Sequence, residues 1–227
     1  METQNWHHPI VYNYQQTIRN KIIGYDLIYE IMISMLKCSD CPQNILIIGA
    51  GGGQELLTLG KLYPYATYTA VDTSMPMLRL AQQQIAQLAQ QLNIEWHNGE
   101  LSSLKANKSF DIVTCHLVLH FLKEMNEKKQ LLQHIAHSLK AGGTCFISSI
   151  NANITGPTFS QQLRLWQESM RHNNLSVDDL NHFEQSFGST THPIPLDKLI
   201  ALLRETGFQT IIPYFKSHMI DALVAIK

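Results

Sequence analysis

Residues 44–55 read NILIIGAGGGQE, and they give the clearest indication of the fold in the sequence. An apolar run that ends in glycine is typical of a strand buried on both faces of a parallel sheet. Gly49, Gly51 and Gly53 then occupy alternate positions before a helical pattern that runs to about Tyr63. Glycine lets a turn approach a ligand closely, and the first turn of a helix presents unpaired N–H groups. The stretch therefore predicts a strand, a ligand-binding turn and a helix.

The alternation of strand and helix patterns continues along the chain. Further strands are predicted over 67–72, 94–97, 110–115 and 144–148, and helices over 74–92 and 124–139. Strands that alternate with helices form a mostly parallel sheet with helices on both faces. The sequence therefore predicts an α/β fold of the Rossmann-like type.

A chain of 227 residues is expected to form a single domain around this sheet. The first forty residues have a helical pattern, and residues 157–187 look helical and polar without a strand. A helix over 197–205 precedes two last strands, over 208–215 and 220–226. The expected parts are an N-terminal helical cap, a cofactor-binding core, a helical insertion, and a final helix with two strands, at residues 1–42, 43–150, 151–192 and 193–227.

Charge and composition argue against several kinds of partner. The net charge is −1, from 17 basic and 18 acidic residues, so no basic excess supports binding to nucleic acid or to a membrane surface. No apolar run reaches the roughly 20 residues of a membrane span, and the N-terminus has no signal-peptide pattern. We expect a cytoplasmic protein that is a monomer or a homodimer.

The cysteines do not predict a metal site. Cys38 and Cys41 form a C-x-x-C pair, whereas Cys115 and Cys145 lie in strand-like runs. Zinc needs further ligands at suitable spacing, and too few converge in this sequence. We interpret all four as ordinary reduced cysteines.

A carboxylate follows the second predicted strand. Asp72 lies 19 residues after Gly53, where it can accept hydrogen bonds from both ribose hydroxyls of an adenosine. Position 54 is Gln and not the last glycine of G-x-G-x-x-G, which argues against a pyrophosphate cofactor such as NAD. Glu100 follows the third strand, where it either accepts a hydrogen bond from an adenine amino group or is a solvated loop residue. Together these residues favour S-adenosylmethionine as the cofactor.

Several motifs carry a resemblance to a known family. They are ILIIGAGGGQE at 45–55, AVDTSMPML at 70–78, NGEL at 98–101, FDIVTCHLVLHFL at 110–122 and LKAGG at 139–143. On these motifs the chain resembles the class I S-adenosylmethionine-dependent methyltransferases. The resemblance implies a seven-stranded sheet in which only the last strand is antiparallel, with the N-terminal helices as a lid.

The same resemblance implies a set of cofactor contacts. The glycine turn would pass beneath the methionine part, Asp72 would hold the ribose, and later residues would lie beside the adenosine or line the site after the fourth strand. The residues concerned are Gly49, Ala50, Gly51, Gly53, Glu55, Asp72, Thr73, Met77, Glu100, Leu101, Cys115 and His116.

One position departs from the family pattern. The family usually has an acidic residue two positions before the first glycine, and that residue often anchors the amino group of the cofactor. Here the position is Ile47. Glu55, at the start of the next helix, is the candidate to compensate.

A narrower resemblance rests on TIRNKIIGY at 17–25, LHFL at 119–122, ALVAIK at 222–227 and the polar insertion. These features resemble a bacterial subgroup that includes the enzyme making carboxy-S-adenosylmethionine for wobble-uridine modification of tRNA. The extra carboxylate of that cofactor needs a cation, for which Arg19 and Arg171 are candidates.

We therefore expect a methyltransferase that acts on a small molecule, with the acceptor pocket above the carboxyl ends of the strands. His116 is the candidate general base, although transfer from a sulfonium often needs only proximity and in-line orientation. Alternatives are a carboxy-S-adenosylmethionine synthase-like enzyme and a non-catalytic cofactor-binding or partner module, which Ile47 would support. The substrate-pocket candidates are Tyr14, Arg19, Tyr25, His120, Trp166 and Arg171.

Overall fold

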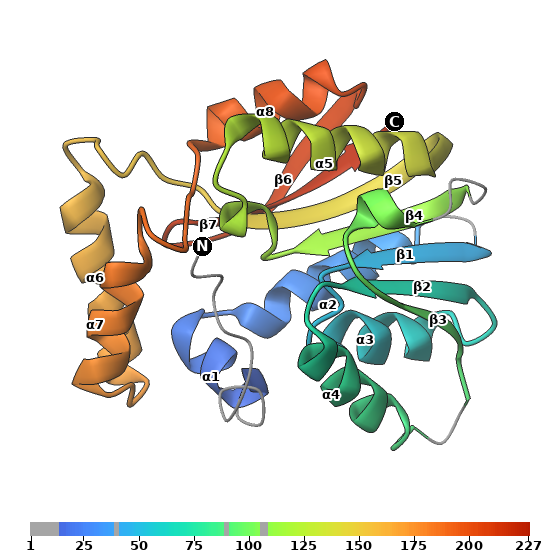
Figure 1. Ribbon diagram of the computed structural model, residues 1–227, viewed down its shortest axis with the longest axis horizontal. Helices are drawn as coiled ribbons and strands as arrows, with labels where there is room; N and C mark the ends of the chain where they lie inside the picture. The colour runs from blue at the N-terminus through green and yellow to red at the C-terminus, as the bar shows by residue number, and fades with distance from the viewer. Residues whose placement is uncertain (1–13, 39–40, 89–90, 105–108) are drawn as a thin grey trace.

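The computed structural model describes residues 14–38, 41–88, 91–104 and 109–227 (Figure 1). A seven-stranded sheet forms its centre, in the order β3-β2-β1-β4-β5-β7-β6. β1 to β5 pair in parallel, and β7 runs antiparallel to both of its neighbours, as predicted. The strands are β1 (Asn44–Ile48), β2 (Thr67–Asp72), β3 (Asn93–Asn98), β4 (Phe110–His116), β5 (Leu139–Ile150), β6 (Thr210–Ser217) and β7 (Ile220–Ile226).

The sheet is buried on both faces because successive residues of its central strands are apolar. In β1, Ile45 and Ile47 join the core on one face, whereas Leu46 and Ile48 join the core on the other. None of the four is more than 5% exposed. Continuous apolar strands of this kind occur where helices cover both faces of a parallel sheet.

Helices form a layer on each face (Figure 1). α2 (Tyr25–Leu36), α3 (Gln54–Leu62) and α4 (Met75–Ile85) contribute to the core on the Ile45 face. α5 (Met125–Ser138) and α8 (Leu196–Glu205) contribute to the core on the Leu46 face. The predicted insertion forms a pair of packed helices, α6 (Phe159–His172) and α7 (Val177–Ser186), with α6 beside α1 (Tyr14–Lys21).

Local sequence explains where several helices begin. The Ser74 side chain caps α4 by accepting from the N–H of Met77, and a proline lies in the first turn. Ser176 and Asp179 form a reciprocal capping box at the start of α7. The helices predicted near the N-terminus are confirmed as α1 and α2, while residues 1–13 lie outside the described part.

Some predicted boundaries were wrong. The helix predicted over 74–92 ends at Ile85, because the chain then tightens into i→i+3 hydrogen bonds at Gln87 and Leu88. The strand predicted over 144–148 extends over 139–150, because β4 and β7 pair along its length. The strands that pair with β5 are separate segments of the chain, so the local sequence pattern does not reveal the full length of β5.

The carboxyl ends of β1, β2 and β4 meet at one edge of the sheet. β1 lies between β2 and β4, so the strand order reverses there. In open α/β sheets, ligands bind outside the carboxyl ends of the strands at such a reversal. Within the described residues, no helix is long and apolar enough to cross a membrane.

Candidate cofactor site

The turn after β1 has a conformation that glycine adopts most readily. Gly49, Gly51 and Gly53 have φ angles of 69°, 47° and 85°, in the left-handed region. A Cβ at Gly49 would clash with the Val118 side chain, and one at Gly53 would lie 3.1 Å from Ala81. The turn therefore packs closely against its neighbours and presents bare backbone at the carboxyl edge of the sheet.

Asp72 ends β2 and is hydrogen-bonded to this turn. One carboxylate oxygen accepts the N–H of Gly51 and the other accepts the N–H of Ser74, each at 2.8 Å. Burial raises the pKa of Asp72, and the two backbone donors oppose that rise. An acidic group is thus fixed beside bare backbone.

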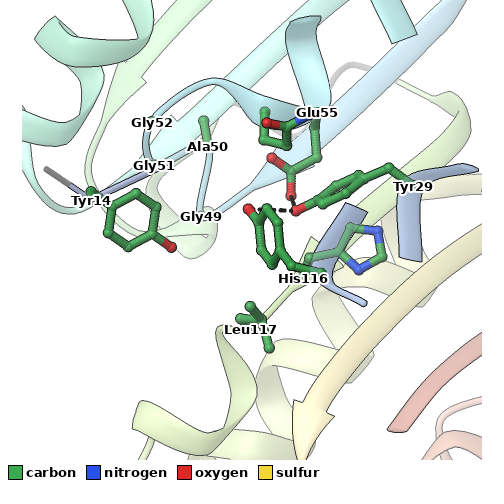
Figure 2. Close-up of a pocket in the computed structure, with 11 residues that line it drawn as sticks. Tyr14, Tyr29, Gly49, Ala50, Gly51, Gly52, Glu55, His116 and Leu117 are labelled. Atoms are coloured by element: carbon green, nitrogen blue, oxygen red, sulfur yellow. Dashed lines mark hydrogen bonds between the residues drawn. The ribbon is translucent and has the colours of Figure 1, made fainter. Parts of the chain in front are cut away.

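Glu55 lies in the first turn of α3 and lines a pocket beside the glycine turn (Figure 2). Its side chain is buried, with 4% exposure. The Tyr29 hydroxyl donates to Oε1 of Glu55 at 3.5 Å, a long and weak hydrogen bond, and lies 3.1 Å from the Tyr25 hydroxyl. Burial raises the pKa of Glu55 to about 8.

Helix α1 is hydrogen-bonded to the glycine turn and to the start of α3. The Gln15 amide donates to the carbonyl of Gly52 at 3.1 Å. The Arg19 guanidinium donates to Gln54 at 2.9 Å and pairs with Asp26 at 2.7 Å. These contacts hold α1, whose first residue Tyr14 also lines the pocket, against the turn.

His116 ends β4 and lines the pocket with its ring beside that of Tyr29, at 5.3 Å between the ring centroids (Figure 2). Its Nδ1 lies 3.0 Å from the Ser148 hydroxyl, and its Nε2 is buried without a hydrogen-bond partner among the described residues. Burial lowers the pKa of His116 to about 3, so the imidazole is neutral at physiological pH and is a much weaker base than the unperturbed side chain. Leu117 follows with a φ of 58°, in the left-handed region.

The residues assigned to the adenosine lie after β2, in the first turn of α4 and after β3. Met77 is buried, and its side chain approaches Gly51. Leu101 is buried in the short helix η1 (Leu101–Ser103), and the exposed Glu100 precedes it and accepts from the Ser102 hydroxyl at 3.1 Å. Thr73 is exposed after β2. Their contacts with a cofactor stay predictions.

The structure brings only some of the predicted residues into the pocket. Its lining includes Gly49, Ala50, Gly51, Glu55, Tyr14, Tyr25 and His116. The Cys115 side chain instead joins the core on the Leu46 face, because successive side chains of a strand point to opposite faces. Arg19 is engaged with Asp26 beside the pocket.

Three predicted substrate-pocket residues do not line this pocket. His120 is buried, and its Nδ1 accepts the N–H of Ile150 at 3.3 Å. Trp166 donates to the carbonyl of Lys21 at 2.7 Å, so α6 uses it to pack against the end of α1. Arg171 pairs with Glu168 on the exposed side of α6. Contacts of these three residues with a substrate stay predictions.

Tyr29, whose hydroxyl donates to Glu55, was not among the residues predicted from the sequence. Its spacing of four residues from Tyr25 on a helix was the available signal, because such residues share a face. Which side chain that face would meet depends on how α2 packs on α3, which the sequence does not state.

A glycine turn, an acidic residue after β2 and this strand order define a nucleoside-binding α/β protein. A family described as a methyltransferase domain matches residues 46–145. The ubiquinone biosynthesis O-methyltransferase of Coxiella burnetii is 32% identical over 112 residues, which are 49% of this chain and 45% of that protein. The chain therefore spans about half the length of this curated relative.

Other matches cover more of the chain. The carboxy-S-adenosyl-L-methionine synthase of Trichodesmium erythraeum is 26% identical over 186 residues, which are 81% of this chain and 72% of that protein. The structure of magnesium protoporphyrin IX methyltransferase from Synechocystis, with bound S-adenosylhomocysteine, has a TM-score of 0.66 at 18% identity and covers 94% of this chain and 87% of that one. Residues 46–145 thus match a methyltransferase domain, and the fold of the chain is similar to that of solved methyltransferase structures.

Proposed function

We propose that this protein is an S-adenosylmethionine-dependent methyltransferase that acts on a small molecule. The observation that carries the proposal is the glycine turn bonded to Asp72 through the N–H of Gly51 at 2.8 Å. Bare backbone beside a carboxylate suits an adenosine that carries no pyrophosphate. The match of residues 46–145 to a methyltransferase domain supports the same activity.

The chemistry of the pocket fits this cofactor. Asp72 would hold the ribose hydroxyls, and the glycine turn would lie against the amino-acid part. The lining also includes the Glu55 carboxyl group and three tyrosine rings, which are groups that attract a cation. When bound, S-adenosylmethionine supplies an electrophilic methyl group on a positively charged sulfur.

The residues on the acceptor side would orient the acceptor and exclude water. With Nδ1–H donating to Ser148, Nε2 of His116 would accept a hydrogen bond from the acceptor. The lowered pKa of His116, about 3, makes full proton removal by this residue unfavourable. The proposed mechanism therefore depends on proximity and orientation rather than on a strong base.

Isothermal titration tests the cofactor assignment. The protein should bind S-adenosylmethionine and S-adenosylhomocysteine but not NAD. Asp72→Ala should weaken binding of S-adenosylhomocysteine about 10- to 100-fold, because charge-assisted hydrogen bonds contribute about 1.5–3 kcal/mol. Asp178→Ala, on exposed α7, is the control. Unchanged affinity in Asp72→Ala would show that the ribose is held elsewhere.

A carboxy-S-adenosylmethionine synthase type of activity is the second candidate. The match to the Trichodesmium enzyme favours it, since that match covers 81% of the chain. The pocket favours methyl transfer instead, because its described lining contains no lysine or arginine for a second carboxylate. Mass spectrometry of the co-purified small molecule distinguishes them: a cofactor heavier by a carboxyl group would favour the second candidate.

A further inference from the structure

Glu55 is a buried carboxyl group for which the described residues supply no cation. Its hydrogen-bond donors are its own backbone N–H and the Tyr29 hydroxyl, the latter at 3.5 Å, and the side chain is 4% exposed. The charged group that acts on it is Asp72, which has the same sign and further opposes ionisation. A buried carboxylate without a cation is costly, so the neutral acid is the stable form of the free protein.

The ionisable groups around Glu55 do not change this balance near neutral pH. Burial raises the pKa of the surrounding tyrosines and of the Cys115 thiol, and it lowers the pKa of His116 to about 3. Arg19 lies over the Tyr25 ring and is bound to Asp26. The ionisable groups that interact electrostatically with Glu55 or share its pocket come from α1, α2, β2, β4 and β6, and they are Tyr14, Tyr25, Tyr29, Asp72, Cys115, His116 and Tyr214.

We propose that Glu55 binds the ammonium group of the cofactor and releases its own proton to solvent when that cation arrives. The inference rests on the proposed function, because it concerns the same pocket. The O–H bond of the Glu55 carboxyl group breaks, the proton passes to the buffer, and the resulting carboxylate accepts hydrogen bonds from the ammonium group and from Tyr29. Ile47, in the strand before the turn, is fully buried and offers no charge for this role.

This coupling makes cofactor affinity depend on pH. Because burial raises the pKa of Glu55 to about 8, the free protein carries the proton at pH 6 to 7 and must lose it for the cation to bind. Affinity for S-adenosylhomocysteine should therefore rise from pH 6 to pH 8, by up to about tenfold per pH unit. Binding near pH 7 should release close to one proton.

The test compares ligands with and without the ammonium group. Titrations of S-adenosylhomocysteine and of 5′-methylthioadenosine, which has the same adenosine and sulfur but no amino-acid group, are run at pH 6, 7 and 8 in buffers of different ionisation enthalpy. Wild-type protein should release a proton with S-adenosylhomocysteine and none with methylthioadenosine. Decarboxylated S-adenosylhomocysteine, which keeps the amine but lacks the carboxylate, should also cause release of a proton when it binds.

Glu55→Gln keeps the shape of the side chain and removes the acid. It should abolish proton release, flatten the pH dependence and weaken S-adenosylhomocysteine binding tenfold or more, while methylthioadenosine affinity stays unchanged. Glu30→Gln, on the exposed side of α2, should change none of these.

The outcomes separate the two proposals. Absence of proton release in the wild type, or an equal effect of Glu55→Gln on both ligands, would overturn the role of Glu55 and leave the proposed function standing. Binding of neither ligand by the wild type would overturn the proposed function and this inference with it.

Discussion

The lack of a side chain at Gly51 has two consequences, one for stability and one for ligand binding. The φ of 47° disfavours other residues, and the exposed backbone would lie under the cofactor. Gly142 offers a matched control, because its φ is 73° and a Cβ there would meet nothing within 4 Å. Gly51→Ala and Gly142→Ala should each lower the unfolding free energy by about 1–2 kcal/mol. Only Gly51→Ala should weaken S-adenosylhomocysteine binding, by tenfold or more in calorimetry. Equal affinity in the two variants would show that the backbone at Gly51 does not lie under the cofactor.

At His116, the structure predicts an imidazole that does not titrate near neutral pH. Burial lowers its pKa to about 3, so its ring nitrogen signals in NMR spectra should stay those of the neutral form between pH 5 and pH 9. The spectrum of His116→Asn assigns the signals. A titration midpoint of the His116 signals between pH 6 and pH 8 would make His116 a candidate general base again.

Among the elements, α1 covers the pocket most directly and is weakly held. None of its residues is fully buried, and Gln15 and Arg19 hold it against the turn and α3. The cavity beneath it has a volume of about 20 Å³, enough for water but not for a nucleoside. We therefore expect α1 to shift when the cofactor enters.

Hydrogen exchange tests this movement. Amides of α1 should exchange faster than those of α3 in the free protein, and S-adenosylhomocysteine should slow exchange in α1. Arg19→Ala should speed exchange in α1 further, because it removes the contacts with Gln54 and Asp26. Exchange in α1 that does not respond to the ligand would exclude a covering role.

The helices and strands that could be predicted from the sequence are those that depend on residues close together in the chain. The apolar run of β1, the glycines after it and the capping Ser74 are short-range signals, and the structure confirms the elements they predict. The early end of α4 has no glycine or proline to mark it. Tyr29 meets Glu55, and Trp166 meets Lys21, only through packing between distant segments, so neither contact could be read from spacing.

For the whole molecule, the reversal of strand order at β1 determines where the glycine turn, Asp72, Glu55 and His116 come together. The parallel strands place their carboxyl ends at one edge, where α1 is hydrogen-bonded to the glycine turn and to the start of α3. The same strand order therefore determines both the fold and the position of the pocket. The alternation of strand and helix patterns in the sequence predicted that fold.

A crystal structure of the protein with S-adenosylhomocysteine would show directly whether the glycine turn and Asp72 bind the cofactor. Both ribose hydroxyls should contact the Asp72 carboxylate, with the amino-acid part of the ligand against the backbone of residues 49–53. A ligand bound elsewhere, or a pyrophosphate seated on the glycine turn, would contradict this arrangement.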